Sequence, residues 1–182
     1  MGNLFSGKTT LMNALASEPY RSELQGLLGG AETHAFTERV EQGSLTDECL
    51  ALFYQDRVAN IFPTETAFLH MRVLQQREIR HLMTREQRES VLILEDRPFL
   101  DGPEVFVKRM IEAGEMPAAH ARLYHTLFYQ TLHHERIRLP DLTVYLRTEP
   151  ELLETRRRKR AQSGDRYAQT ITATYLGEIH EL

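Results

Sequence analysis

The sequence predicts an α/β protein in which a parallel sheet is flanked by helices. Two apolar runs, 91–94 and 142–146, have the continuity expected of strands that are covered on both faces. Helix-forming segments separate the two runs, and the polar residues Glu95-Asp96-Arg97 directly follow the first. Because strands that alternate with helices form a parallel sheet with ligand groups at its carboxyl edge, we expect the functional residues there.

Proline, glycine and capping residues divide most of the remaining chain into predicted helices. Ser44 or Thr46 is suited to cap one helix, and Thr148-Glu149-Pro150-Glu151 has the pattern of a capping box with proline in the first turn. A break is expected near Ser163-Gly164. The predicted helices cover residues 8–16, 20–28, 44–54, 63–83, 103–114 and 117–136, a basic segment after residue 149, and a last stretch to residue 182.

The longest predicted helix, 63–83, is expected to have Pro63 in its first turn, where a missing backbone N–H needs no partner. Phe68, Met71 and Leu74 recur at helical spacing, and we expect them on one face.

A weaker strand candidate covers residues 33–37. The expected sheet therefore has only about three strands, which is few for this fold class.

Composition bounds the class of protein. The chain has 182 residues, of which 41% are hydrophobic and 26% charged, so we expect a single globular domain over residues 1–182. The net charge of −4 gives no reason to expect binding to nucleic acid or to an anionic membrane. Cys49 is the only cysteine, which excludes intrachain disulfides, and neither a membrane-spanning run nor a signal peptide is recognisable. A cytoplasmic location is the natural expectation.

The first ten residues contain a phosphate-loop pattern, in which Gly2 is followed by four free positions and then by Gly7-Lys8-Thr9. The glycines allow successive backbone N–H groups to point into one concavity, the lysine can bind the outer phosphates, and the threonine hydroxyl can coordinate Mg²⁺. A turn without a ligand is the alternative. The predicted phosphate-binding residues are Gly2, Asn3, Ser6, Gly7, Lys8, Thr9 and Thr10.

A phosphate loop normally follows a buried strand, but only Met1 precedes Gly2. Three interpretations remain open: the chain is a fragment, its start is placed late, or the loop is supported in another way. We therefore expect a sheet that lacks the strand leading into the loop.

Carboxylates at the strand ends are the candidate catalytic groups. Asp96 follows the best strand and would lie opposite the loop, where a nucleotide-bound Mg²⁺ is held, while Arg97 would meet the phosphoryl group or hold a neighbouring carboxylate. The alternative for this pair is a strand-end ion pair. Glu38 could take the proton from an attacking hydroxyl, but it could also be a solvated acid, since Glu32 and Glu41 lie near it in the sequence.

The basic run 156–160 is the second candidate for phosphate binding. Arg156 and Arg160 are four residues apart and share a helix face, where like charges repel, and Glu154 is almost the only nearby acid. A polyanion between the two arginines would explain the arrangement, as in a lid over residues 156–169 that closes on a transferring phosphate. A solvated helix face is the alternative.

Six stretches of the chain, in this order, resemble the deoxynucleoside kinase family, relatives of the thymidylate kinases. They are GNLFSGKTT at 2–10, TERVEQGSLTDECLALFYQD at 37–56, FPTETAFLHMRVLQQ at 62–76, DRPFLDGPEVFVKRM at 96–110, PDLTVYLRTEPELLETRRRKR at 140–160 and YLGEIHEL at 175–182. The resemblance implies an ATP-dependent kinase that uses Mg²⁺ to phosphorylate a deoxynucleoside at its 5′-hydroxyl. It also implies a homodimer through the helices around 45–56 and 63–83.

The resemblance carries roles onto individual residues. Glu38 matches the family's general base, Asp96 and Arg97 match its acid–arginine motif, and Arg156 and Arg160 match two lid arginines. Arg72 matches an arginine of the base-binding helix, and Phe68 lies close to it in the sequence. These matches predict a catalytic group of Glu38, Asp96 and Arg97, with Arg72 and Phe68 near the base.

Departures from the family pattern concern the base, the lid and the sheet. Glu65 stands where the family reads the base with glutamine, and an ionised carboxylate only accepts hydrogen bonds, so a base that offers an amino donor would suit it better. Gln162 replaces a further lid arginine, and Gly102 aligns with a common acid, with Asp101 beside it. The family's first strand and last strand have no counterpart.

A nucleoside monophosphate kinase of thymidylate type and a non-catalytic nucleotide-binding paralogue remain as alternatives.

Overall fold

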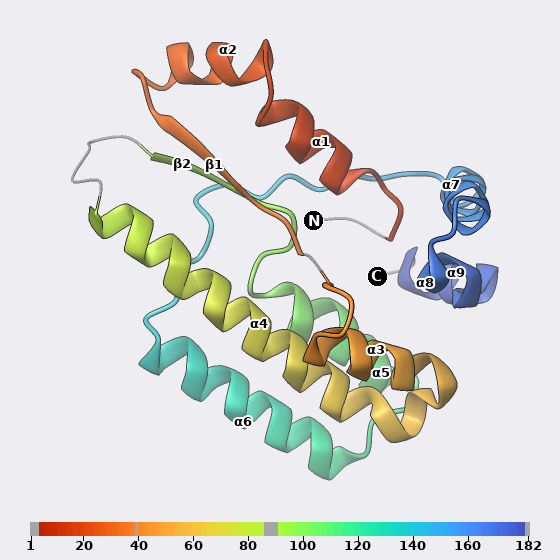
Figure 1. Ribbon diagram of the computed structural model, residues 1–182. Helices are drawn as coiled ribbons and strands as arrows, with labels where there is room; N and C mark the ends of the chain where they lie inside the picture. The colour runs from red at the N-terminus through yellow and green to blue at the C-terminus, as the bar shows by residue number, and fades with distance from the viewer. Residues whose placement is uncertain (1–3, 39, 86–90, 181–182) are drawn as a thin grey trace.

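The computed structural model describes residues 4–38, 40–85 and 91–180 and has a short parallel sheet between helices (Figure 1). In this part of the chain the sheet pairs β1 (Glu32–Phe36) with β2 (Val91–Glu95). The Asp96 backbone N–H donates to the Phe36 carbonyl at 3.0 Å, which extends the pairing by one residue past β2. The predicted α/β class and the parallel direction of these strands are confirmed.

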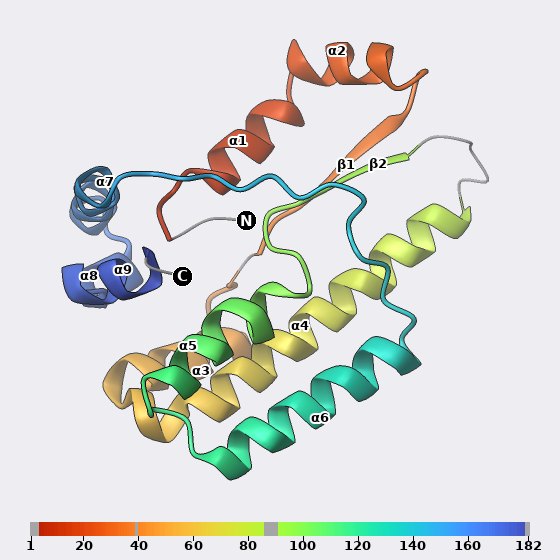
Figure 2. The same cartoon turned by 180° about the vertical axis from the view of Figure 1, so that it is seen from behind.

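Helices make up most of the described chain. They are α1 (Lys8–Leu15), α2 (Tyr20–Leu27), α3 (Leu45–Gln55), α4 (Arg57–Arg85), the π-helical turn η1 (Gly102–Val107), α5 (Lys108–Glu112), α6 (Ala118–His134), α7 (Pro150–Gln162), α8 (Arg166–Thr170) and α9 (Ala173–His180). Figures 1 and 2 show α1 and α2 on one side of the strands and α4 on the other, with α3 and α6 against α4. Helices α7, α8 and α9 lie together at one end of the molecule.

The main hydrophobic core lies among α3, α4, η1 and α6, away from the sheet. Its centre is tightly enclosed, because Tyr124 is 0% exposed and Phe128 only 1% exposed. The rings of Phe99 and Phe128 stack with their centroids 4.9 Å apart. A second, smaller core joins α7, α9 and Ile171, the residue after α8, around Leu153, which is fully buried.

Polar caps explain where several helices begin. The Ser44 hydroxyl accepts a hydrogen bond from the Asp47 backbone N–H at 3.2 Å, so Ser44, and not Thr46, caps α3. The Asp165 side chain accepts from the N–H groups of Tyr167 and Ala168 and caps α8 after the break predicted near Ser163-Gly164.

The predicted start of the long helix was wrong. Pro63 lies inside α4, which begins six residues earlier at Arg57. The Asp56 carboxylate accepts from the Ala59 N–H at 3.1 Å and supplies an earlier cap, while Ile61 anchors the added turns in the core. The predicted apolar face was also partly wrong, because Leu74 is exposed and Leu69 and Val73 pack into the main core, while Phe68 is buried outside that core.

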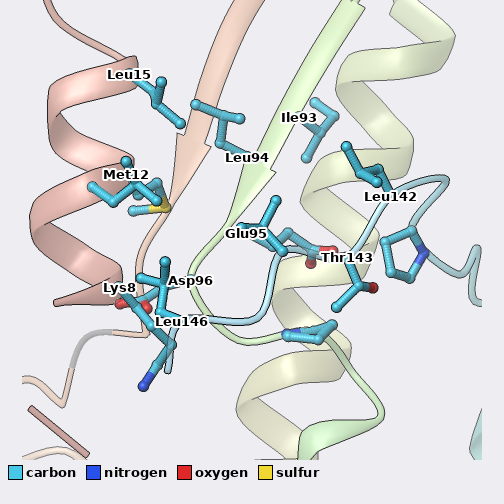
Figure 3. Close-up of a pocket in the computed structure, with 14 residues that line it drawn as sticks. Lys8, Met12, Leu15, Ile93, Leu94, Glu95, Asp96, Leu142, Thr143 and Leu146 are labelled. Atoms are coloured by element: carbon cyan, nitrogen blue, oxygen red, sulfur yellow. The ribbon is translucent and has the colours of Figure 1, made fainter. Parts of the chain in front are cut away.

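The predicted strand 142–146 did not form. Within it only Leu146 makes an isolated bridge, and Leu142 is 80% exposed. The segment runs alongside β2 but is separated from it by an apolar cavity of about 160 Å³, so continuous backbone pairing with β2 is absent from the described chain. Figure 3 shows Leu142 and Thr143 across this cavity from Leu94 and Met12, with Lys8 and Asp96 at one end.

Within the described chain, no helix combines the length and the apolar character needed to cross a bilayer.

Candidate active site

The described part of the phosphate loop turns into α1 through Gly7. Gly7 has φ +100°, a left-handed conformation that favours glycine, and its carbonyl accepts the Leu11 N–H at 2.9 Å in the first turn of α1. Ser6 is buried, and its hydroxyl has no hydrogen-bond partner among the described residues. Gly2 and Asn3, two of the predicted phosphate ligands, lie outside the described residues, and Thr10 is exposed on α1.

The loop and the end of β2 meet at Thr9 and Asp96. The Thr9 hydroxyl donates to Asp96 Oδ2 at 2.5 Å, and Asp96 is buried. The other carboxylate oxygen, Oδ1, has no partner within the described chain. A hydroxyl beside a carboxylate with a spare oxygen is a donor set that suits Mg²⁺, which takes few protein ligands and keeps waters and phosphates as the others. The two predicted metal ligands therefore fit the ion.

Lys8 lies beside the same carboxylate. It lines a hollow of about 180 Å³ together with Thr9, Asp96, Arg97 and Glu38. Burial lowers the pKa of Lys8 to about 8, and the nearby Arg97 adds to this effect against the opposing pull of Asp96. A lysine that is poorly solvated in this way gains most from a polyanion, because the added negative charge restores its preference for the protonated form.

Glu38, which lies just after β1, is held by two arginines from different elements. Its Oε1 accepts from Arg72 on α4, and its Oε2 pairs with Arg97 after β2, each at 2.8 Å. Burial acts to raise the pKa of Glu38, but the charges of Arg97 and Arg72 outweigh it and hold the pKa below its ordinary value. The carboxylate is therefore ionised and fixed in direction.

The two predicted lid arginines both reach the phosphate loop. Arg156 on α7 donates to the backbone carbonyls of Phe5 at 3.1 Å and Ser6 at 2.9 Å. Arg160 lies over the Phe5 ring, with 5.5 Å between its guanidinium carbon and the ring centroid, and it also lines the hollow around Lys8. The neighbouring Arg157 and Arg158 instead pair with Glu154, so the basic run divides into two faces.

A second cavity, of about 330 Å³, adjoins the hollow and opens toward α3 and α4. Glu65, Phe68 and Arg72 from α4, the three residues predicted to bind the nucleoside, all line it. Arg72 lies over the Phe68 ring with 5.7 Å between its guanidinium carbon and the ring centroid. Glu65 is buried, and burial raises the pKa of its carboxyl group to about 7.

Glu38, Arg97 and Arg160 line both cavities. They therefore stand at the junction between the hollow under the phosphate loop and the larger cavity on α4. The arrangement brings a carboxylate and two cations to the point where a group bound in one cavity would meet a group bound in the other.

Sequence reasoning missed the residues that cover the larger cavity. Tyr54 on α3 and Tyr167 on α8 both line it, with their ring centroids 5.7 Å apart. The Tyr167 hydroxyl and the Arg166 guanidinium donate to the Asp47 carboxylate, which ties α8 to α3. The only signal in the sequence was the capping position of Asp165, which predicts that a helix begins there but not what it contacts.

Comparisons with known proteins give one family. The family model described as deoxynucleoside kinase matches residues 1–182. Among solved structures, deoxyadenosine kinase from M. mycoides with bound dCTP has a TM-score of 0.68 and 19% identity, covering 100% of this chain and 77% of that chain. The same enzyme with bound dATP has a TM-score of 0.68 at 20% identity and 78% coverage of that chain. At this identity the structures establish a shared fold.

Proposed function

We propose that this chain, which belongs to the deoxynucleoside kinase family and is therefore a kinase, transfers the γ-phosphate of ATP to the 5′-hydroxyl of a deoxynucleoside. The observation that carries this proposal is the position of Glu38 at the junction of the two cavities. ATP phosphates would occupy the hollow under the loop, and the nucleoside would occupy the cavity on α4.

On the phosphate side, Lys8 and the backbone of residues 2–10, with the side chains of Asn3, Ser6 and Thr10, bind the phosphates of ATP. Thr9 and Asp96 would hold Mg²⁺, which when bound neutralises charge that develops on the phosphates. Arg97, Arg156 and Arg160 stabilise the moving phosphoryl group, since cations fixed in advance favour the transition state over the ground state. Two observations support the assignment: one hollow is lined by Ser6, Lys8, Thr9, Asp96, Arg97 and Arg160, and Arg156 donates to the Ser6 carbonyl.

On the nucleoside side, Glu65, Phe68 and Arg72 bind the base and orient the nucleoside. Glu38 then accepts the proton of the 5′-hydroxyl as the oxygen attacks the γ-phosphate. Its lowered pKa makes Glu38 a weak base. Because the transition state of phosphoryl transfer is loose, the attacking hydroxyl loses its proton late, and a weak base suffices. Arg72 and Arg97 keep its oxygens turned toward the junction.

We also propose that residues 156–169 act as a lid, within a single domain of residues 1–182. Arg156 and Arg160 touch the loop from α7, and α8 covers the nucleoside cavity through Tyr167.

The same proposal includes a homodimer through α3 and α4 and a cytoplasmic location. Leu45, Leu52 and Val58 are exposed on these helices, which supports a covered surface in solution. The molecular mass measured in solution tests the dimer.

An assay with ATP, Mg²⁺ and each of the four deoxynucleosides tests the function, with separation of the 5′-monophosphate as the readout. Thymidine and its monophosphate are compared in the same assay, because a thymidylate-type kinase would phosphorylate only the latter. We expect a nucleoside 5′-monophosphate from at least one deoxynucleoside. ATP binding without any product would favour the non-catalytic alternative.

A further inference from the structure

Glu65 is a buried carboxyl group in which one oxygen lacks a hydrogen-bond partner among the described residues. It is 6% exposed, it lines the cavity on α4, and its Oε2 has no hydrogen-bond partner among the described residues. Burial of this oxygen is unfavourable, because it loses its water without gaining a hydrogen bond, and only the charges of Arg72 and Arg97 favour the ionised carboxylate. A ligand that donates hydrogen bonds would supply what is missing.

The face of α4 gives the direction in which a nucleoside would lie. Glu65, Phe68 and Arg72 are spaced three and four residues apart, so they follow one another along one side of the helix. Arg72 is tied to Glu38 at the junction with the phosphate hollow. Glu65 is seven residues away, about 10 Å along the helix axis, which is comparable to the length of a nucleoside. A 5′-hydroxyl at Glu38 therefore places the far edge of the base near Glu65.

The pairing edges of the four bases differ in what they offer a carboxylate. Guanine presents its N1–H and its N2 amino group side by side. Adenine and cytosine each present an amino donor beside a ring nitrogen that only accepts, and thymine presents one N–H between two carbonyls. Because an ionised carboxylate has acceptors only, guanine alone can satisfy both of its oxygens with donors.

We propose that Glu65 makes this cavity select deoxyguanosine, by accepting two parallel hydrogen bonds from N1–H and the N2 amino group of guanine. This inference rests on the proposed function and refines it by naming the base. Adenine, cytosine and thymine each set an acceptor against one of the carboxylate oxygens, which leaves a buried charge without a donor.

The charge state of Glu65 modulates this selection. The charged and titratable groups around it are Arg72 on the same helix, Glu38 after β1, Arg97 after β2, Tyr124 on α6 and Tyr175 on α9. Burial raises the pKa of Glu65 to about 7. Above that pH the carboxylate predominates and matches guanine, whereas below it the neutral group can both donate and accept, which suits adenine and cytosine. The preference for guanine should therefore increase with pH.

Deoxyguanosine and deoxyinosine form a matched pair of probes, since they differ only in the N2 amino group. With ATP at a pH about one unit above the pKa of Glu65, we expect kcat/KM for deoxyguanosine to exceed that for deoxyinosine by about 10- to 100-fold, the effect of one hydrogen bond to a charged group. Thermal shifts of the protein with each nucleoside measure the same preference without turnover.

Glu65→Gln removes the charge while keeping the shape, and Glu78→Gln, at an exposed position of α4, is the matched control. We expect Glu65→Gln to abolish most of the difference between deoxyguanosine and deoxyinosine and to raise activity with deoxyadenosine or deoxycytidine. The control should keep the wild-type order. In the wild type, the ratio of kcat/KM for deoxyguanosine to that for deoxyadenosine should rise with pH, because ionisations shared by both reactions cancel in the ratio.

Failure of the inference is distinguishable from failure of the proposed function. The assignment of Glu65 is overturned if the wild-type enzyme phosphorylates another deoxynucleoside better than deoxyguanosine. It is also overturned if deoxyinosine matches deoxyguanosine in turnover and in thermal shift. In both cases the kinase assignment stands. If no nucleoside is phosphorylated but deoxyguanosine still stabilises the protein more than deoxyinosine, the catalytic proposal fails and the base selection stands.

Discussion

The helical layer of this molecule and its sheet layer are packed very differently. In the layer of α3, α4, η1 and α6, Tyr124 and Phe128 are almost fully enclosed. In the sheet layer every residue of β2 is only partly buried, and an apolar cavity lies along the strand. The groups proposed for phosphate transfer are attached to the looser layer, and those proposed to hold the base are attached to the denser one. Stability and chemistry should therefore respond to different substitutions.

The largest effect is expected from a cavity in the helical layer. Phe128→Ala removes a ring that is 1% exposed and stacked on Phe99, so it should lower the free energy of unfolding by about 3–5 kcal/mol. Urea denaturation measures the change. A loss below about 1 kcal/mol would mean that this layer is not the main source of stability.

The next largest effect is expected from Lys8→Ala, which changes the sheet layer and should lower activity rather than stability. We expect kcat/KM to fall by about 100- to 1,000-fold, since a cation at the transferred phosphate is lost, while the urea midpoint stays near that of the wild type. Lys108→Ala, at an exposed position of α5, is the control and should change neither. An active Lys8→Ala enzyme would contradict the position assigned to the phosphates.

Glu38→Gln tests the junction between the two layers. If Glu38 accepts the proton of the 5′-hydroxyl, kcat should fall by roughly 100-fold or more, with a smaller change in KM. Glu41→Gln, at an exposed position three residues later, should keep the wild-type kcat. An unchanged kcat in the Glu38 variant would leave this residue as a structural partner of Arg72 and Arg97 only.

The smallest effect is expected at the open side of the sheet layer. Leu142→Ser changes a side chain that is 80% exposed, so the free energy of unfolding should change by no more than about 0.5 kcal/mol. The comparison with Phe128→Ala is made by the same urea denaturation. A loss above about 1 kcal/mol would indicate that the segment 142–146 is part of a core in solution.

Local chemistry in the sequence predicted the contact between the loop and the end of β2. The pattern that ends in Gly7-Lys8-Thr9 and the polar end of β2 predicted that Lys8 and Asp96 would meet, and the two line one hollow. Such features were accessible because a glycine, a strand end and a following helix each act within a few residues.

Features that depend on distant partners were not predictable in the same way. The apolar run 142–146 has the composition of a strand, but a strand also needs an edge within hydrogen-bonding distance, and here a cavity separates it from β2. Pro63 favours a helix start, yet the cap at Asp56 and the burial of Ile61 decided otherwise. The contact of Tyr167 with Asp47 joins residues 120 positions apart, which no short pattern encodes.

That contact has a consequence for access to the larger cavity. Helix α8 covers the larger cavity, and its hydrogen bonds to the Asp47 carboxylate fasten it to α3, one of the helices beside that cavity. Movement of α8 away from this cavity requires these hydrogen bonds to break. The pKa of Asp47 is lowered to about 2, chiefly by the hydrogen bond from Tyr167. Acidification therefore weakens the hydrogen bonds between α8 and Asp47 only as the pH approaches that value. At neutral pH the cover over the larger cavity is thus held in place by a clasp of three side chains, Asp47, Arg166 and Tyr167.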